Sequence, residues 1–416
     1  MSFQKIRKDA ATVLEYVYLF LFGIVVLYTF LQKTTFQIPW AMFMRTAEGS
    51  LRVWCEWLIE PPYRLLGCTA ALRCLIQRKY NWKTTLAAVG VLIVGNYLWH
   101  QNGYYRTILF AVLVAGAIGI SYQRLIKLYF LIVSGTLLIT VICAVTGLIE
   151  NYTVVRDGNI RMFFGINAPT NFASFVYFQI LCWWYLRKEK LTYKEVAGTA
   201  VLTVLLYIFC NTRTACILLL TVSVSMIWMK YRSEIQIKTG RPYQMNSLIS
   251  GLCALAYPVL AIVMIGLTLL YSRNSVILSK IDTLITGRLS YGKKAFDIYG
   301  VSFFGKYIRL FGFDDGQAVS NYFYIDSSYV QMAVMFGLVM MVLLLLAFFI
   351  ICEKAREQKD WIFLLVLVFA GLHSAIEPHL IEIQYCPFLL ALLADTKNRN
   401  GLRLSEIFGR RAWTRG

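Results

Sequence analysis

The sequence predicts an all-α, polytopic integral membrane protein with one long external loop. Hydrophobic residues make up 58% of the 416 residues and charged residues only 15%, whereas soluble domains carry roughly 45–50% apolar and about 25% charged residues. The mean hydropathy is +0.60. The apolar residues lie in long runs separated by basic loops, which is typical of a chain that crosses a membrane many times.

A helix needs roughly 20 mostly apolar residues to cross about 30 Å of hydrocarbon. Runs of this kind predict about 12 membrane helices within a single membrane domain, some of them short or interrupted by polar residues. In chain order they cover residues 13–31, 61–76, 84–99, 104–120, 125–149, 168–186, 196–210, 214–229, 249–271, 329–351, 361–374 and 381–395.

The basic residues predict the orientation, because short loops rich in Lys and Arg stay in the cytoplasm. The loops around residues 76–84, 186–196 and 229–249 are short and basic, and residues 396–416 form a basic tail. We therefore expect both termini to be cytoplasmic.

The longest polar segment, residues 272–325, is then external. Within it, Ile281, Leu284 and Leu289 recur at helical spacing, which predicts an amphipathic helix on the outer membrane surface with Arg288 near the edge of its apolar face. Recognition or chemistry is expected in this external loop.

The net charge of +19 has a topological source in the inside loops, but external cations beside apolar spans also suit an anionic lipid phosphate or diphosphate. The basic residues are scattered over short loops, so nucleic acid is not an expected partner.

The ten cysteines include no CxxC pair, and His100, His373 and His379 have no metal-ligand spacing beyond the loose HSAIEPH. No metal and no cofactor is expected.

Three arginines and one acid stand out at the external ends of predicted spans. Arg161 opens a span, Arg213 lies between two apolar runs with almost no loop, and Arg288 follows a glycine in the long loop. Each has an ordinary alternative, since interfacial arginines snorkel to the membrane surface, although a charge as deep as Arg213 usually faces a cavity or a partner. Asp326 precedes a span, where it would serve as a helix N-cap or as a functional carboxylate.

The order of these motifs resembles the O-antigen polymerase and ligase family, the Wzy-like lipid-carrier glycosyltransferases of bacterial envelopes. RMFFGINAPTNFAS starts a middle span, TRT follows the next span, the long loop opens near TGR and closes on DSSYVQMAVMFG, and HSAIEPHL lies near the last span. Glu377 in this last motif resembles an acid of the polymerases. The resemblance covers about residues 161–390, and each motif is short.

The resemblance implies a metal-independent polysaccharide polymerase at the outer face of a bacterial cytoplasmic membrane. Its donor and acceptor would be glycans linked through a diphosphate to an isoprenoid, and a chain-length regulator is a possible further partner. Arg213 and Arg288 would bind the diphosphate leaving group, assisted by Arg161. Asp326 would take the proton of the acceptor hydroxyl, and Glu377 is the reserve candidate for that role.

Three alternatives remain open. Ligases of the same family often carry His-Asn where this chain has Asp326-Ser327, which favours a polymerase without excluding a surface-polymer ligase. A flippase for lipid-linked oligosaccharides would also use a cationic interior, but the two halves show no internal repeat. An enzyme using lipid-monophosphate sugars would need an acidic pair in the first external loop, which offers only separated glutamates.

Overall fold

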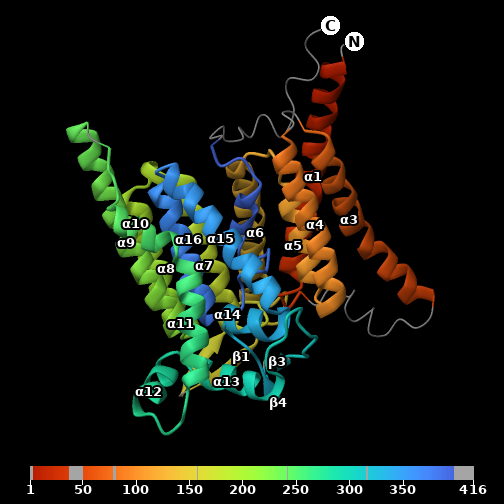
Figure 1. Ribbon diagram of the computed structural model, residues 1–416. Coiled ribbons are helices and arrows are strands. Elements are labelled where there is room, and N and C mark those ends of the chain that lie inside the picture. The colour runs from red at the N-terminus through yellow and green to blue at the C-terminus, as the bar shows by residue number, and fades with distance from the viewer. Residues whose placement is uncertain are drawn as a thin grey trace.

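The computed structural model describes residues 3–36, 50–77, 81–156, 158–240, 242–314 and 317–397. Long helices run between two ends of the molecule (Figure 1). We call the end that carries all four short strands the loop end, and the end at which α1 begins the opposite end. The helices of this bundle are α1 (Phe3–Leu31), α3 (Ser50–Leu75), α4 (Trp82–Asn102), α5 (Tyr105–Gly116), α6 (Tyr122–Val145), α7 (Pro169–Arg187), α8 (Tyr193–Cys210), α9 (Arg213–Thr239), α10 (Ser247–Ala254), α11 (Ala256–Leu270), α15 (Leu338–Glu357) and α16 (Trp361–Ile376).

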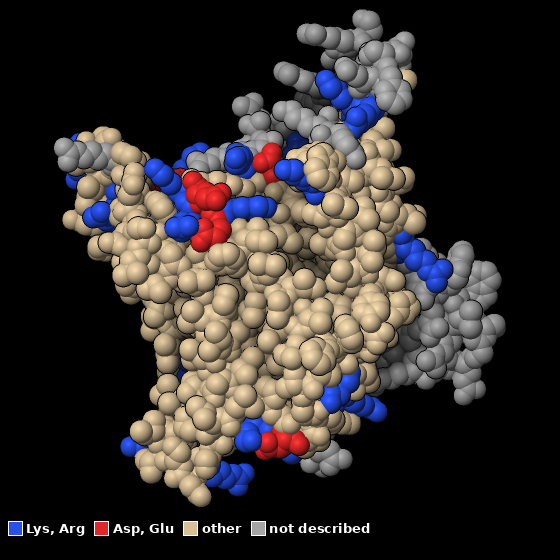
Figure 2. All heavy atoms as spheres, viewed as in Figure 1, with Lys and Arg blue, Asp and Glu red and all other residues tan. Residues whose placement is uncertain are grey.

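Within the described residues, five helices are long and apolar enough to cross a membrane, and a sixth crossing is formed if α10 and α11, bent by 59°, are one span. The five lie at Ile6–Leu31, Tyr122–Val145, Tyr193–Cys210, Arg213–Thr239 and Leu338–Glu357. On the face shown in Figure 2, most charged side chains gather toward the two ends, and the belt between them carries few charges. The predicted helical membrane protein is confirmed, whereas its count of about 12 spans stays a prediction.

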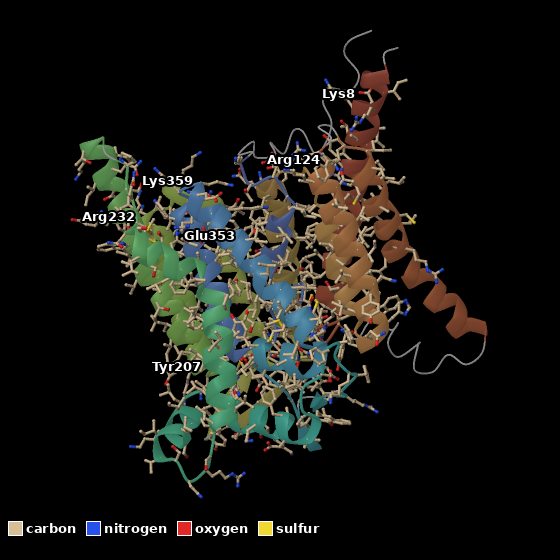
Figure 3. The ribbon with its side chains drawn as sticks, in the orientation of Figure 1. Lys8, Arg124, Tyr207, Arg232, Glu353 and Lys359 are labelled. Carbon is tan, nitrogen blue, oxygen red and sulfur yellow. The ribbon has the colours of Figure 1, made fainter. Side chains whose placement is uncertain are left out.

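The opposite end carries many of the cations that the sequence assigns to inside loops. Lys8, Arg124, Arg232 and Lys359 lie there together with Glu353 (Figure 3). Some of these charges tie helices together, as Arg124 does by pairing with Glu15 of α1 at 2.5 Å. The assignment of this end to the cytoplasm stays a prediction, and the basic tail after residue 397 lies outside the described residues.

Helix α16 forms the centre of the helical bundle. Its neighbours α7 and α11 pack against it, and most of its side chains are buried. Three buried tyrosines from other elements donate their hydroxyls to its main-chain carbonyls: Tyr177 to Phe369 at 2.9 Å, Tyr257 to Leu367 at 2.9 Å and Tyr329 to Gly371 at 3.1 Å. Such bonds satisfy polar groups that could not reach water within a membrane.

The prediction of a membrane helix over residues 381–395 is wrong. The chain leaves α16 at Glu377 and returns irregularly to the start of α6, with only the short 3-10 helix η3 (Phe388–Leu392) on the way. Pro378 and Pro387 interrupt helical hydrogen bonding in this stretch. The segment is almost wholly buried, and Tyr129 donates to the carbonyls of Gln384 and Tyr385 at 2.8 and 2.6 Å. Irregular backbone is tolerated at membrane depth where protein encloses it.

The long polar segment over residues 272–325 is also more divided than the sequence predicts. The single amphipathic helix is two helices, α12 (Val276–Leu284) and α13 (Arg288–Tyr299), separated where Thr286 and Gly287 take positive φ angles of 58° and 87°. The loop end further holds two short antiparallel hairpins, which are small additions to a mostly helical structure. The hairpins are β1 (Thr153–Arg156) with β2 (Asn159–Met162), and β3 (Phe311–Asp314) with β4 (Gln317–Phe323).

The predicted span 329–351 is broken by a contact between two glycines. The short helix α14 (Ser328–Gln331) and the π-helical turn η2 (Met332–Phe336) precede Gly337, after which α15 begins. Gly337 and Gly305 have φ angles of 91° and 89°, and a Cβ on Gly337 would lie 2.3 Å from the Gly305 nitrogen. Only glycine fits such an approach in this conformation. The contact ties the long polar segment to the first turn of α15.

Gly337→Ala is therefore expected to destabilise the protein by more than about 2 kcal/mol, because the methyl group clashes with main chain and the positive φ angle strains alanine. The thermal unfolding midpoint of the purified protein in detergent measures this. Gly135→Ala is the matched control, since no atom lies within 4 Å of its added Cβ. Equal midpoints for the two variants would contradict the role of the glycine contact.

Candidate functional site

Arg288 is placed by the start of α13. Gly287 supplies the left-handed N-cap, and the buried Asp282 of α12 accepts hydrogen bonds from the main-chain N–H groups of Leu289 at 2.8 Å and Ser290 at 3.2 Å. A carboxylate at this position satisfies free N–H groups and suits the positive end of the helix dipole. The turn that divides the predicted amphipathic helix is thus the feature that aims Arg288 into the protein.

The Arg288 guanidinium lies between two carboxylates from distant elements. Its Nη2 is 2.8 Å from Oε1 of Glu377, directly after α16, and its Nε is 3.8 Å from Oδ2 of Asp326, just before α14. Nε also donates to the carbonyl of Ile376 at 3.2 Å. The structure thereby brings together the three residues for which the sequence suggests catalytic roles, within one ion-pair cluster that is mostly shielded from solvent.

Arg161, Arg213 and Arg288 line one small cavity at the loop end, of about 30 Å³. Arg161, in β2, is 5% exposed and donates from Nε to the Cys210 carbonyl at 2.7 Å. Arg213 is the exposed first residue of α9. The cavity, which we call the arginine cavity, is lined by Arg156, Arg161, Thr170, Asn211, Thr212, Arg213, Thr214, Thr286 and Arg288.

The arginine cavity suits an anion. No carboxylate is among its described lining residues, and the N-terminal end of α9 adds a positive dipole. Burial and the neighbouring Arg156 lower the pKa of Arg161 to about 10, which leaves this side chain protonated at neutral pH. Several guanidinium groups held in a partly buried site bind phosphate oxygens through charge-assisted hydrogen bonds.

Asp326 and Glu377 lie in connecting segments at the loop end, where burial favours their neutral forms. Burial raises the pKa of Asp326, against the opposing effect of Arg288. Burial raises the pKa of Glu377 to about 7, again opposed by Arg288. The N-cap alternative for Asp326 is wrong, because Ser327 occupies the N-cap position of α14. Asp326 is also the more accessible acid, with 18% of its side chain exposed against 7% for Glu377.

A second charged group, missed in the sequence reasoning, surrounds Glu382. Its Oε1 lies 2.6 Å from Arg106 Nη1 and 3.4 Å from Lys33 Nζ, and its Oε2 lies 2.8 Å from His379 Nδ1. His379 Nε2 is in turn 3.9 Å from Glu377 Oε2, so one imidazole ring separates the two acids. The signal in the sequence is a glutamate inside a predicted span, since such charges usually have a partner.

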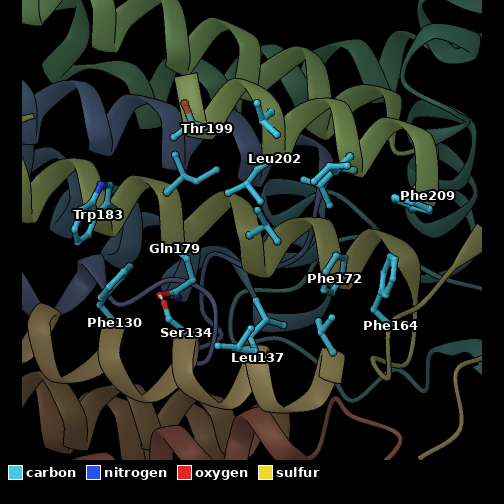
Figure 4. Close-up of a pocket in the computed structure, with 18 of the residues that line it drawn as sticks. Phe130, Ser134, Leu137, Phe164, Phe172, Gln179, Trp183, Thr199, Leu202 and Phe209 are labelled. Carbon is cyan, nitrogen blue, oxygen red and sulfur yellow. Dashed lines mark hydrogen bonds between the residues drawn. The ribbon is translucent and has the colours of Figure 1, made fainter. Parts of the chain in front are cut away.

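An apolar groove runs along the helices beside the arginine cavity. It lies between α6, α7 and α8 and has a volume of about 970 Å³. Phe164 and Phe209 lie at one end of the groove and Trp183 and Phe130 at the other (Figure 4). Phe209 directly precedes Cys210, whose carbonyl holds Arg161, so the groove and the cationic cavity adjoin. We call it the apolar groove.

Among the described residues, no group of three or more His, Cys, Asp or Glu side chains is arranged to hold a metal ion. Comparison of the chain with protein-family models, curated proteins and solved structures finds no match.

Removing the cap at Asp282 is expected to loosen the start of α13. Asp282→Ala should cost about 1 kcal/mol of stability, because two N–H groups lose their acceptor. Hydrogen exchange measured by mass spectrometry should become faster at the first turn of α13. Asp282→Asn keeps an acceptor oxygen and should stay close to wild type; identical exchange in all three proteins would rule out the capping role.

Proposed function

We propose that this protein is a polysaccharide polymerase that joins isoprenoid-diphosphate-linked repeat units at the outer face of a bacterial cytoplasmic membrane. One observation carries the proposal: Arg161, Arg213 and Arg288 line a single cavity while Arg288 also contacts Asp326 and Glu377. Cations for a leaving group and carboxylates for a proton are the two needs of glycosyl transfer from a diphosphate carrier.

The arginine cavity would hold the diphosphate. Its volume of about 30 Å³ is about that of one water molecule in the liquid, so a diphosphate requires the lining side chains to move apart. Arg156 and Arg213 form the exposed side of the cavity, whereas Arg161 and Arg288 are buried and anchored. Binding would exchange repulsion among the arginines for attraction to the phosphates.

The apolar groove supports an isoprenoid as the carrier of that diphosphate. Most of its lining is apolar, with several exposed aliphatic side chains such as Leu138 and Val201. A long apolar tail in the groove would place its polar end beside Phe164 and Phe209, next to the arginine cavity. A shape with an apolar length and a cationic end matches a polyisoprenyl diphosphate better than a soluble sugar nucleotide.

In the proposed reaction, the oxygen of an acceptor sugar hydroxyl forms a bond to the anomeric carbon of the donor glycan. The bond from that carbon to the diphosphate oxygen breaks, and its electron pair leaves with the diphosphate, where Arg161, Arg213 and Arg288 stabilise the charge. The hydroxyl proton passes to the Asp326 carboxylate. Glu377, which holds Arg288 at 2.8 Å, acts as a positioning residue in this scheme.

Arg288→Ala is expected to lower polymer formation by about 100-fold or more, since it removes a preorganised cation from the leaving group. The measurement is the electrophoretic profile of surface polysaccharide in a strain lacking the protein and complemented with each variant. Arg273→Ala is the control, because Arg273 is an exposed cation in the same external segment that does not line the arginine cavity.

Single repeat units should accumulate in the Arg288→Ala strain, while Arg273→Ala restores long chains. Long chains of normal amount in the Arg288→Ala strain, with the protein present in the membrane, would contradict the proposal. Long chains that never reach their final anchor in the deletion strain would instead identify a ligase.

The transfer rate should fall as the pH is lowered through the raised pKa of Asp326. Burial raises this pKa above that of an ordinary aspartate, so the basic form is lost at a higher pH than usual. Asp326→Asn should reduce the rate by about 10²–10⁴-fold and remove this acid limb. Initial rates of the purified protein in liposomes, with a lipid-linked repeat unit as substrate, test both; an unchanged pH profile in Asp326→Asn excludes Asp326 as the base.

A further inference from the structure

A second cavity at the loop end lies among α1, α3, α5 and the irregular segment that follows α16. Its volume is about 340 Å³, and its lining includes Tyr28, Tyr63, Tyr105, Lys33, Arg106 and Glu382. We infer that this tyrosine cavity binds an acidic sugar unit of the glycan. Its assignment to the acceptor chain rests on the proposed function, whereas sugar binding itself does not.

The aromatic wall suits a sugar ring. The rings of Tyr28 and Tyr63 lie edge to face with centroids 6.0 Å apart, and Tyr63 and Tyr105 repeat the arrangement at 5.1 Å. Tyrosine combines an apolar ring face with a polar hydroxyl, which matches a sugar that carries C–H groups on its faces and hydroxyls on its rim. The amides of Gln32 and Gln384 add further donors and acceptors to the lining.

The charge distribution suits an acidic group on that sugar. Lys33 and Arg106 both pair with the single carboxylate of Glu382, which is 3% exposed. The described lining residues thus carry one more positive than negative charge. Arg106 keeps 41% of its side chain exposed and has donors beyond the one that meets Glu382, so it can also bind a carboxylate of the ligand.

The cavity is close to the candidate catalytic acids. Glu382 lies on its wall, His379 contacts Glu382 at 2.8 Å, and the other side of the His379 ring is 3.9 Å from Glu377. An acceptor glycan held in the tyrosine cavity would have its end near Glu377, which contacts Arg288 of the arginine cavity. The donor diphosphate and the acceptor sugar would then occupy separate cavities on either side of one imidazole.

The test is binding of cellobiouronic acid, with neutral cellobiose as the matched probe, to the protein in nanodiscs. Saturation-transfer difference NMR should show binding of the acidic disaccharide, weakened roughly tenfold or more in Arg106→Gln through loss of a charge-assisted bond. Arg106→Lys should restore part of it, and Tyr63→Leu should weaken both disaccharides. Unfolding midpoints establish that each variant is folded.

Three results would overturn the inference: no binding of cellobiouronic acid, binding that Arg106→Gln leaves unchanged, or displacement by inorganic phosphate with no effect of Tyr63→Leu, which would indicate an anion site only. Arg288→Ala should keep the sugar binding while losing polymer formation. Disaccharide binding is measured without any glycosyl transfer, and polymer formation is measured without the disaccharide. A failure of the sugar site and a failure of the proposed polymerase function can therefore be told apart.

Discussion

The buried guanidinium of Arg288 requires carboxylate partners, and the loop end is arranged to supply them. A buried charge without a partner is strongly destabilising, so the start of α13, the end of α16 and the entry to α14 must meet at one point. Glu377 and Asp326 meet this need at 2.8 and 3.8 Å. The same requirement holds the polar segment 272–325 against the helical bundle, where the contact of Gly305 and Gly337 adds a second attachment. Stability and the proposed chemistry therefore depend on the same ion pairs.

Hydropathy predicted the helical bundle, because an apolar run long enough to cross a membrane has few other stable structures. Hydropathy failed for residues 381–395, because an apolar segment buried in protein has the same hydropathy as one that faces lipid. Arg161, Arg213 and Arg288 could be selected because cations beside apolar spans are costly. Their common cavity could not be derived, as it depends on a hairpin, a helix start and a turn far apart in the chain. Glu382 pairs with Lys33 and Arg106, which lie hundreds of residues before it in the sequence. Local sequence patterns carry no information on such a pairing.

The two cavities of the loop end differ in how their cations are balanced. The arginine cavity has no acid among its described lining residues. Its Arg288 is paired with Glu377 and Asp326, but three arginines against these two acids still favour a strongly anionic ligand, because Arg161 and Arg213 line the same cavity. In the tyrosine cavity, Glu382 offsets part of the charge of Lys33 and Arg106, and tyrosine rings dominate the remaining wall. One cavity is thus suited to phosphates and the other to a weakly acidic sugar. His379 lies between them, against the ring of Tyr385 with centroids 3.8 Å apart, which fixes the imidazole in place.

The irregular segment from Glu377 to Asp395 has a consequence for how the protein is assembled. A helix can enter lipid alone, because its own hydrogen bonds satisfy its backbone, but an irregular chain cannot. The donors and acceptors of this segment find partners such as Tyr129 of α6 and Ile120, which precede it in the chain. Helix α6 and the turn that precedes it must already be in place before the segment can pack against them. Glu377, His379 and Glu382 are therefore positioned late, and the bundle stays incomplete at its centre until they arrive.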